Sequence, residues 1–93
     1  MRIEWLPTAE RNRESQIAYV AERNPRAAIG MDDAIEAAVS RLADYPHSGR
    51  PGRIKGTREL VVSGTPYIVA YRVEANAVVI LHLLHGAQRP TRL

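Results

Sequence analysis

The sequence contains no cysteine, which excludes a disulfide framework and a thiolate metal site and is usual for a cytoplasmic protein. Apolar runs such as residues 77–81 are far shorter than the ~18 residues that a membrane span requires. The chain does not open with a charged region followed by an apolar stretch, so no signal peptide is expected. Repeats and low-complexity tracts are absent as well. We therefore expect a small, soluble, cytoplasmic protein with no membrane partner.

Lysine is scarce: of 13 cationic residues, Lys55 is the only lysine and the rest are arginine. Arginine presents a planar fork of donors that suits carboxylates and phosphates, although high genomic GC content would also favour it. The net charge is only +3, but its distribution is uneven. No acid lies between Asp44 and Glu59, and four cations fall in that interval: Arg50, Arg53, Lys55 and Arg58. This basic segment indicates an acidic partner, either nucleic acid or an acidic protein segment.

The length of 93 residues predicts one domain, covering residues 1–93, because chains of this size rarely divide. Hydrophobic residues make up 45% and charged residues 25% of the sequence, enough for a folded core. A domain this small buries only about 60 to 65% of the surface that its unfolded chain exposes. The core is therefore expected to be thin.

The amino-terminal half predicts a short strand and two helices. Arg2–Trp5 alternates polar and apolar residues, and Pro7 ends this strand. A helix is expected over residues 8–23, although Arg13 and Gln16 place polar side chains on its apolar face.

The second helix has clearer signals. Asn24 can cap its free amide groups and Pro25 suits its first turn. Apolar residues then recur at helical spacing as far as Leu42, and Pro46 ends the pattern. Because the two helices are joined with almost no loop, they should form a helical hairpin.

After residue 57 the apolar period changes from that of a helix to that of a strand. Strands are expected at residues 59–62, Tyr67–Val73 and 77–84, joined by short turns. Short connections predict an antiparallel three-stranded meander. The last strand should be an inner one, with Val78, Ile80, His82 and Leu84 on one face. The predicted fold class is α+β, in the order β-α-α-β-β-β, with the helical hairpin against one face of a twisted sheet.

Residues 46–57 contain three glycines and two prolines and carry the basic segment. They lack the spacing of a nucleotide-binding loop. Two interpretations remain open: a solvated connection between hairpin and sheet, or a loop that contacts phosphate or a partner. Tyr67 and Tyr71 share one face of their strand, where they could stack on bases or pack in the sheet.

The histidines do not suggest a metal site. His82 and His85 differ by three positions in a strand, so they point to opposite faces. His85, where the strand ends, is the better candidate for acid–base chemistry. A metal-independent ribonuclease would need a base, an acid and cations for the phosphoryl charge. The candidates for these roles are His85, Arg72, Arg58 and Glu59. No metal and no cofactor is expected.

Five ordered segments resemble the ParE/RelE superfamily of type II toxins. They are Asn24-Pro25-x-Ala27-Ala28, Leu42-x-x-Tyr45-Pro46-x-x-Gly49-Arg50-x-Gly52, residues 56–62, Tyr67–Val73 and residues 79–88. The family's fold matches the architecture predicted above. The resemblance implies a bacterial cytoplasmic toxin that arrests growth, stabilises a plasmid or chromosome and is neutralised by a cognate antitoxin.

Members of this superfamily differ in mechanism. RelE-type members cleave mRNA in the ribosome, whereas ParE-like members poison DNA gyrase by trapping its cleaved DNA complex. This sequence resembles the ParE-like branch more closely, because Ile68 replaces a catalytic arginine of the ribonucleases, and residues 60–62 replace their basic residues. Arg13 and Gln16 depart from the apolar pattern of the first helix, and Arg89 stands where a tryptophan is usual.

The resemblance therefore implies a gyrase poison that is not an enzyme, neutralised by a ParD-like antitoxin that is acidic, partly disordered alone and bound in a hetero-oligomer. The alternatives are a ribosome-dependent mRNA endoribonuclease and a non-toxic binding module. The residues expected to face gyrase or its DNA are Arg50, Arg53, Lys55, Arg58, Arg72, Arg89 and Arg92. Those expected to contact the antitoxin are Arg13, Gln16, Tyr45 and Arg72.

Overall fold

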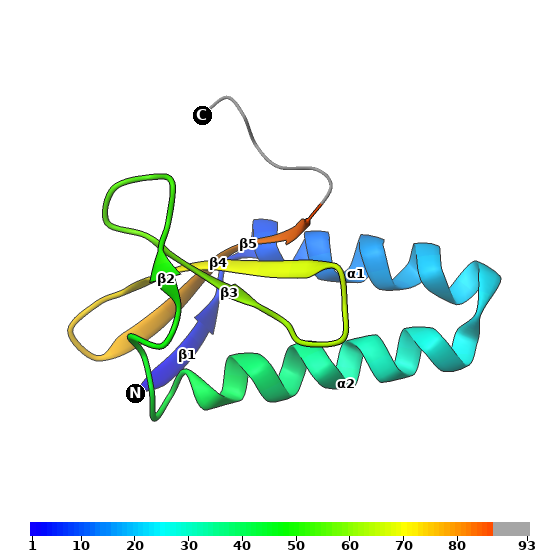
Figure 1. The fold of residues 1–93 in the computed structure, drawn as a ribbon, viewed down its shortest axis with the longest axis horizontal. Helices are drawn as coiled ribbons and strands as arrows, with labels where there is room; N and C mark the ends of the chain where they lie inside the picture. Colours follow the sequence, from blue (N-terminus) through cyan, green and yellow to red (C-terminus); the bar gives the residue numbers. More distant parts are fainter. Residues whose placement is uncertain (87–93) are drawn as a thin grey trace.

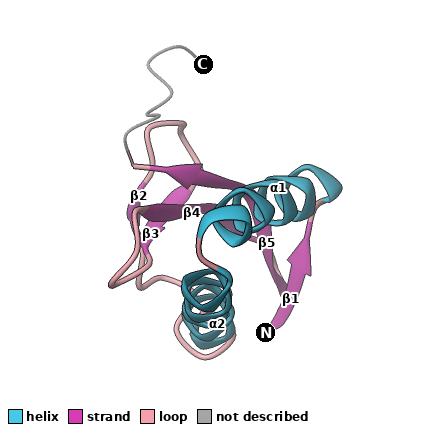
Figure 2. Cartoon of the chain, turned by 90° about the vertical axis from the view of Figure 1, so that its right-hand side faces the viewer, coloured by secondary structure: helices cyan, strands magenta, loops and turns pink. Residues whose placement is uncertain are grey.

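The computed structural model describes residues 1–86, and it consists of a helical hairpin packed on one five-stranded sheet. The elements are β1 (Arg2–Trp5), α1 (Pro7–Arg23), α2 (Pro25–Arg41), β2 (Arg50–Pro51), β3 (Arg58–Val61), β4 (Tyr67–Val73) and β5 (Ala77–His85). Figures 1 and 2 show both helices on the same side of the sheet. The predicted α+β class and the helical hairpin are confirmed.

The strand order in the sheet is β1-β5-β4-β3-β2. The meander of β3, β4 and β5 is antiparallel, as expected, and β5 is an inner strand. β1 runs parallel to β5, so the sheet is mixed. β2 was not predicted: it pairs Arg50 with Glu59 and Pro51 with Arg58 at the far edge. Part of the segment expected to be a connection is therefore a strand.

Asn24 begins α2 in the way that the sequence predicts. Its side-chain oxygen accepts a hydrogen bond from the amide of Ala27 at 3.1 Å, while Pro25 occupies the first turn. The cap satisfies one of the amide groups that a helix start leaves unpaired. Asn24 also ends α1, since its amide bonds to the carbonyl of Val20 at 2.8 Å. One residue thus forms the whole corner of the hairpin.

The core lies between the hairpin and one face of the sheet, here called the helix face. Tyr67, Val69 and Tyr71 of β4 are buried on this face, among Ile35, Val39 and Leu42 from α2 and its carboxyl end. The packing interpretation of the two tyrosines is thereby confirmed. The opposite face of the sheet is called the outer face.

One prediction about β5 was wrong. The pairing changes register between Ala70 and Tyr71, which lie opposite His82 and Ile80. This leaves Leu81 as an extra residue in β5, a β-bulge that reverses the facing of all later side chains. Val78 and Ile80 therefore share the helix face with Leu83 and His85, while His82 and Leu84 lie on the outer face. Because the alternation of side chains is reversed after the bulge, Leu83 lies on the helix face and is buried in the core.

Candidate target-binding site: the basic hairpin

The basic segment forms a β-hairpin, residues 50–59, which we call the basic hairpin. β2 and β3 are its arms, and its turn is closed by a hydrogen bond from the Gly52 amide to the Thr57 carbonyl at 2.7 Å. Gly56 has a φ of 84°, a conformation that residues with a side chain rarely adopt. In Figure 1 the turn projects away from both helices. Its tip presents Arg53, Ile54 and Lys55, all exposed.

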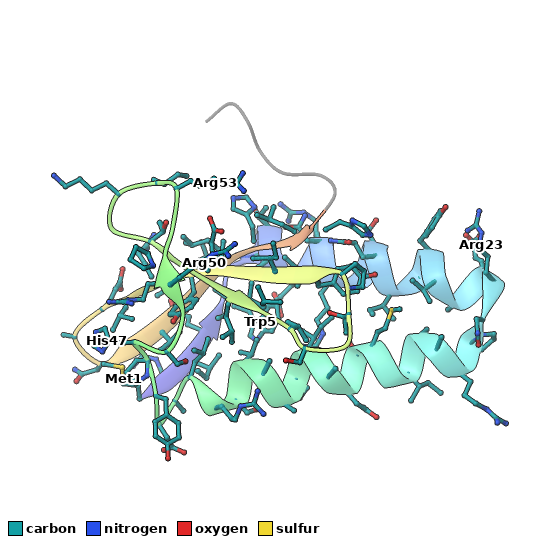
Figure 3. All side chains as sticks on the ribbon, viewed as in Figure 1. Met1, Trp5, Arg23, His47, Arg50 and Arg53 are labelled. Carbon is teal, nitrogen blue, oxygen red and sulfur yellow. The ribbon has the colours of Figure 1, made fainter. Side chains whose placement is uncertain are left out.

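A single carboxylate holds the base of this hairpin. Glu59 is 9% exposed, and its two oxygens accept hydrogen bonds from the Arg50 guanidinium and from the Arg53 amide, each at 3.3 Å. Buried carboxylates are stable only when they are paired in this way. Glu59 therefore fixes where the turn leaves the sheet, and Figure 3 shows Arg50 and Arg53 at the base and near the tip of the hairpin.

The chain that leads into the hairpin is anchored in the core. The Tyr71 hydroxyl donates to the Pro46 carbonyl at 2.8 Å and accepts from the Gly49 amide at 2.9 Å. The Arg58 guanidinium donates to the carbonyls of His47 and Gly49, the latter at 2.7 Å. Arg58 was expected to face the target, but these bonds occupy part of its guanidinium within the chain.

The structure separates the residues nominated for ribonuclease chemistry. Glu59 and Arg72 lie on the outer face, whereas His85 lies on the helix face, edge-on to Tyr67 with ring centres 5.9 Å apart. Arg72 is exposed and forms an ion pair with Glu74 at 2.6 Å. The set His85, Arg72, Arg58 and Glu59 is therefore not assembled at one place.

His82 is the histidine that shares a face with Glu59. Strand pairing aligns Arg50, Glu59, Ala70 and His82 in one row across four strands. Sequence reasoning missed this row because the bulge in β5 reverses the facing of His82. In an all-apolar run such as residues 77–81, nothing in the pattern marks where a bulge will fall.

The residues expected to contact the antitoxin all lie outside the basic hairpin. Arg13 bonds to Asp32 at 2.7 Å and to Glu36 at 3.1 Å, and its guanidinium lies over the Trp5 ring at 5.0 Å. Burial opposes the charge of Arg13, but the two carboxylates outweigh it and raise the pKa of the guanidinium. Arg13 therefore joins α1 to α2.

Gln16 also has a partner within the chain. Its side-chain amide donates to the Leu83 carbonyl at 2.9 Å, and the Asn12 side chain accepts from the Leu83 amide at 3.3 Å. β1 pairs with β5 only as far as Ile80. Beyond that point, the side chains of Gln16 and Asn12 bond to the backbone of Leu83 in place of a neighbouring strand. Tyr45, in contrast, is 66% exposed beyond α2. Antitoxin contacts at Arg13, Gln16, Tyr45 and Arg72 stay predictions.

Arg89 and Arg92 lie outside the described residues. Within residues 1–86 no three His, Asp or Glu side chains are grouped closely enough to hold a metal ion, and no helix there is long and apolar enough to cross a bilayer.

No pattern in the sequence predicted a groove of 710 Å³ that lies between the helices and the β3–β4 turn. Its lining includes Tyr19, Val20, Met31 and Tyr67. The distinctive surface of the described chain is thus the projecting basic hairpin.

Comparisons with known proteins give a consistent result. The sequence model for the ParE toxin of the type II toxin–antitoxin system parDE matches residues 3–90. A protein of Sinorhizobium fredii named "Putative toxin Y4kP" is 46% identical over 88 residues, which cover 95% of this chain and 91% of that protein. Toxin RelE1 of Caulobacter vibrioides is 30% identical over 83 residues, covering 87% of this chain and 88% of that protein.

Two solved structures share the fold. A chain from the chromosomal ParDE toxin–antitoxin system of Pseudomonas aeruginosa superposes with a TM-score of 0.82 at 22% identity, covering 91% of this chain and 95% of that one. A chain of the toxin–antitoxin complex RelBE2 from Mycobacterium tuberculosis gives a TM-score of 0.59 at 24% identity, covering 90% and 88%. At these identities the structures establish the architecture alone.

Proposed function

Because the chain belongs to the ParE toxin family of type II toxin–antitoxin systems, we propose that it arrests bacterial growth by poisoning DNA gyrase. It does so by binding in the cytoplasm, without chemistry of its own. The observation that carries the proposal is the basic hairpin: a projection held at its base by Glu59 and Tyr71, whose tip places Arg53 and Lys55 in solvent. Cations held on a fixed backbone suit the phosphates of gyrase-bound DNA or an acidic surface of the enzyme.

The hydrogen bonds at the base of the hairpin support a binding function. Glu59 and Tyr71 fix its base before any target arrives, so binding does not have to order this segment first. The charged tip would hold the cleaved DNA complex mainly through electrostatic contacts. Such contacts weaken as salt is raised, because phosphate neutralisation releases counterions.

An antitoxin is the second partner of this toxin. The solved relatives include a ParDE system and a toxin–antitoxin complex. We propose a ParD-like antitoxin that is acidic and partly disordered alone, and that forms a hetero-oligomer with this basic chain. Opposite net charges would accelerate the association, and folding of the antitoxin on binding would allow it to cover a large surface.

One observation favours a second candidate, a ribosome-dependent mRNA endoribonuclease. The row formed by Arg50, Glu59 and His82 places a cation, a carboxylate and an imidazole on the outer face, and one relative is named RelE1. Against this candidate, both oxygens of Glu59 already accept hydrogen bonds from within the hairpin. A carboxylate held in this way is a poor general base.

The deciding experiment is induction of the toxin without antitoxin, with pulse labelling of DNA and protein synthesis together. Early loss of DNA synthesis accompanied by gyrase-linked DNA breaks is the expected result. Early loss of translation would instead establish the ribonuclease, and His82→Ala and His85→Ala would then show which histidine acts. Continued growth would leave only a binding module.

The hairpin is tested by the double variant Arg53→Glu with Lys55→Glu. We expect toxicity to fall at least tenfold while the thermal midpoint stays within about 2 °C of the parent. The matched control is Arg11→Glu with Arg26→Glu, which makes the same change in net charge on exposed positions of the helices. Full toxicity of a folded hairpin variant would contradict the assignment, and equal losses in both variants would reduce it to a net-charge effect.

A further inference from the structure

A small pocket lies along one side of the basic hairpin. It has a volume of 330 Å³, and its lining consists of His47, Pro51, Gly56, Thr57, Arg58 and Val73. His47 belongs to the chain that enters the hairpin, and most of the other lining residues belong to the hairpin itself. None of the residues that line the pocket is acidic, whereas Arg58 brings a fixed positive charge to it. The pocket therefore suits an anion.

Arg58 has hydrogen-bond donors that the chain does not use. A guanidinium has five N–H donors, and the bonds from Arg58 to the carbonyls of His47 and Gly49 both come from Nη1. Nε and Nη2 have no partner within residues 1–86. Every fully buried side-chain nitrogen or oxygen in that part of the chain does have a partner, so solvent must reach both atoms. The bonds that hold Arg58 in place thus leave the rest of its fork available.

Two further donors belong to residues that line the same pocket. The His47 ring is exposed and forms no hydrogen bond or ion pair with the described residues. The Gly56 amide is also unpaired within residues 1–86, because the bonds of the turn come from the amides of Gly52 and Thr57. Guanidinium forks, polar side chains and backbone amides are the groups that bind phosphate oxygens. The donor set of the pocket is therefore one that recognises phosphate.

We propose that this pocket binds a backbone phosphate of DNA while the tip of the basic hairpin contacts another phosphate of the same duplex. The inference rests on the gyrase-bound DNA target proposed above and adds a second contact to it. Figure 3 shows His47 at the base of the hairpin and Arg53 near its tip. Because phosphates recur at regular intervals along DNA, one duplex offers a charge to both places. A contact made through phosphate positions the DNA and does not read its sequence.

Other occupants fit the pocket less well. A metal cation would meet the charge of Arg58 and no carboxylate ligand. An acidic segment of the antitoxin carries carboxylates, which an arginine fork also binds. Such a segment would have to be ordered over the length of the hairpin to reach the pocket and the tip together, which costs entropy. A DNA duplex is stiff before it binds, so the arrangement favours DNA.

The first test measures binding of the full-length toxin to a short DNA duplex without gyrase, by fluorescence anisotropy at several salt concentrations. His47→Glu places a carboxylate beside the free part of the Arg58 fork. It should raise the dissociation constant about tenfold and lower the slope of log K against log salt by about 1, the value of one lost phosphate contact.

The matched control for this variant is Ser63→Glu. It introduces the same charge at an exposed position in the turn between β3 and β4, and it should change the dissociation constant less than threefold with no change in slope. Equal losses in the two variants would overturn the inference, because they would show an effect of net charge alone. A parent toxin that does not bind the duplex would overturn it as well.

The second test locates the contact by nuclear magnetic resonance. The His47 ring and the Gly56 amide should shift when the duplex is added. The Gly64 amide is the reference, because Gly64 is also exposed in a turn and has a similar φ of 78°, and it should not shift. Shifts at Lys55 with an unchanged His47 ring would confine DNA to the tip and overturn the inference. A His47 shift caused by the cognate antitoxin and not by DNA would also overturn it, since the occupant would then be a carboxylate.

Failure of this inference can be told apart from failure of the proposed function. Gyrase-linked DNA breaks that persist at the parent level in His47→Glu, with unchanged affinity for the duplex, would overturn the pocket and leave gyrase poisoning intact. If the parent toxin binds the duplex through His47 but DNA synthesis continues after induction, gyrase poisoning is wrong and the phosphate site stands.

Discussion

The Tyr71 hydroxyl oxygen lies 2.9 Å from the Gly49 amide nitrogen, and this contact connects the core to the chain that leads into the basic hairpin. Gly49 passes so close to the tyrosine ring that only a residue without a side chain can be accommodated. A β-carbon placed there would lie 2.8 Å from Tyr71 Cε1 and 2.9 Å from the Glu59 carbonyl oxygen. The position of the candidate target-binding site thus depends on a fully buried phenol.

Removing that phenol oxygen should destabilise the protein. Tyr71→Phe leaves the Gly49 amide and the Pro46 carbonyl without their partner, which costs about 1 to 3 kcal/mol of unfolding free energy. Urea denaturation measures the loss. Tyr67→Phe is the matched control, because no described residue forms a hydrogen bond with the Tyr67 hydroxyl, and it should cost less than about 0.5 kcal/mol. Equal costs for the two variants would contradict the anchoring role.

Replacing two different glycines with alanine should change the free energy of unfolding in opposite directions. Gly49→Ala forces a contact with backbone and should cost about 1 to 3 kcal/mol, the usual range for overpacking. Gly30→Ala, within α2, meets no atom within 4 Å and should stabilise the protein by about 0.5 to 1 kcal/mol through helix propensity. Thermal unfolding of the two variants checks the signs, and a stabilised Gly49→Ala would show that the approach at Tyr71 is looser than described.

Gln16, a polar residue of α1, should contribute to the stability of the fold. Gln16→Ala removes the donor to the Leu83 carbonyl and leaves a partly buried acceptor unpaired, at a cost of about 1 to 2 kcal/mol. Ser15→Ala, on the same helix and exposed, should change stability by less than about 0.5 kcal/mol. A Gln16→Ala variant as stable as the parent would show that solvent replaces the bond to β5.

Alkaline pH should weaken the fold through Tyr67. Burial disfavours the phenolate and raises the pKa of Tyr67 above its ordinary value of 10.0. The unfolded chain therefore releases this proton first as pH rises, and the folded state loses stability between the unfolded and the folded pKa. Unfolding free energies measured from pH 8 to 11 should fall more steeply for the parent than for Tyr67→Phe. Parallel curves would contradict this contribution.

The apolar periods of the sequence predicted most of the fold. The helical spacing in residues 25–42 and the alternation in Tyr67–Val73 gave elements that the structure confirms within one or two residues. β2 was not predicted because Arg50–Pro51 has only two residues, and a proline next to a glycine is a sequence typical of a turn. The bulge at Leu81 escaped it because β5 is apolar on both faces there, so a change of facing leaves no trace in the pattern.

The candidate site was predictable in its charge and not in its geometry. Exposure of Arg53 and Lys55 follows from a basic segment rich in turn residues. The anchor of that segment is distant along the chain, since Tyr71 lies 22 positions from Gly49. Elsewhere in the fold, Gln16 lies 67 positions from its partner Leu83. Pairings of this kind depend on the assembled sheet, so no local pattern can reveal them. They also account for Arg13 and Gln16, the polar residues on the apolar face of the first helix, which bond to Asp32 and to Leu83.

The parallel pairing of β1 with β5 has a consequence for synthesis of the protein. Residues Arg2–Trp5 are synthesised 75 residues before their partners, Ala77–Ile80, as the register Arg2 to Ala77 shows (77 − 2 = 75). β5 is also the strand that joins β1 to the rest of the sheet. Translation adds roughly 5 to 20 residues per second, so the nascent chain spends several seconds without the strand that joins β1 to the rest of the sheet. The sheet therefore cannot be completed until β5 has been translated, and β1 has no partner strand while both helices and the other strands are made.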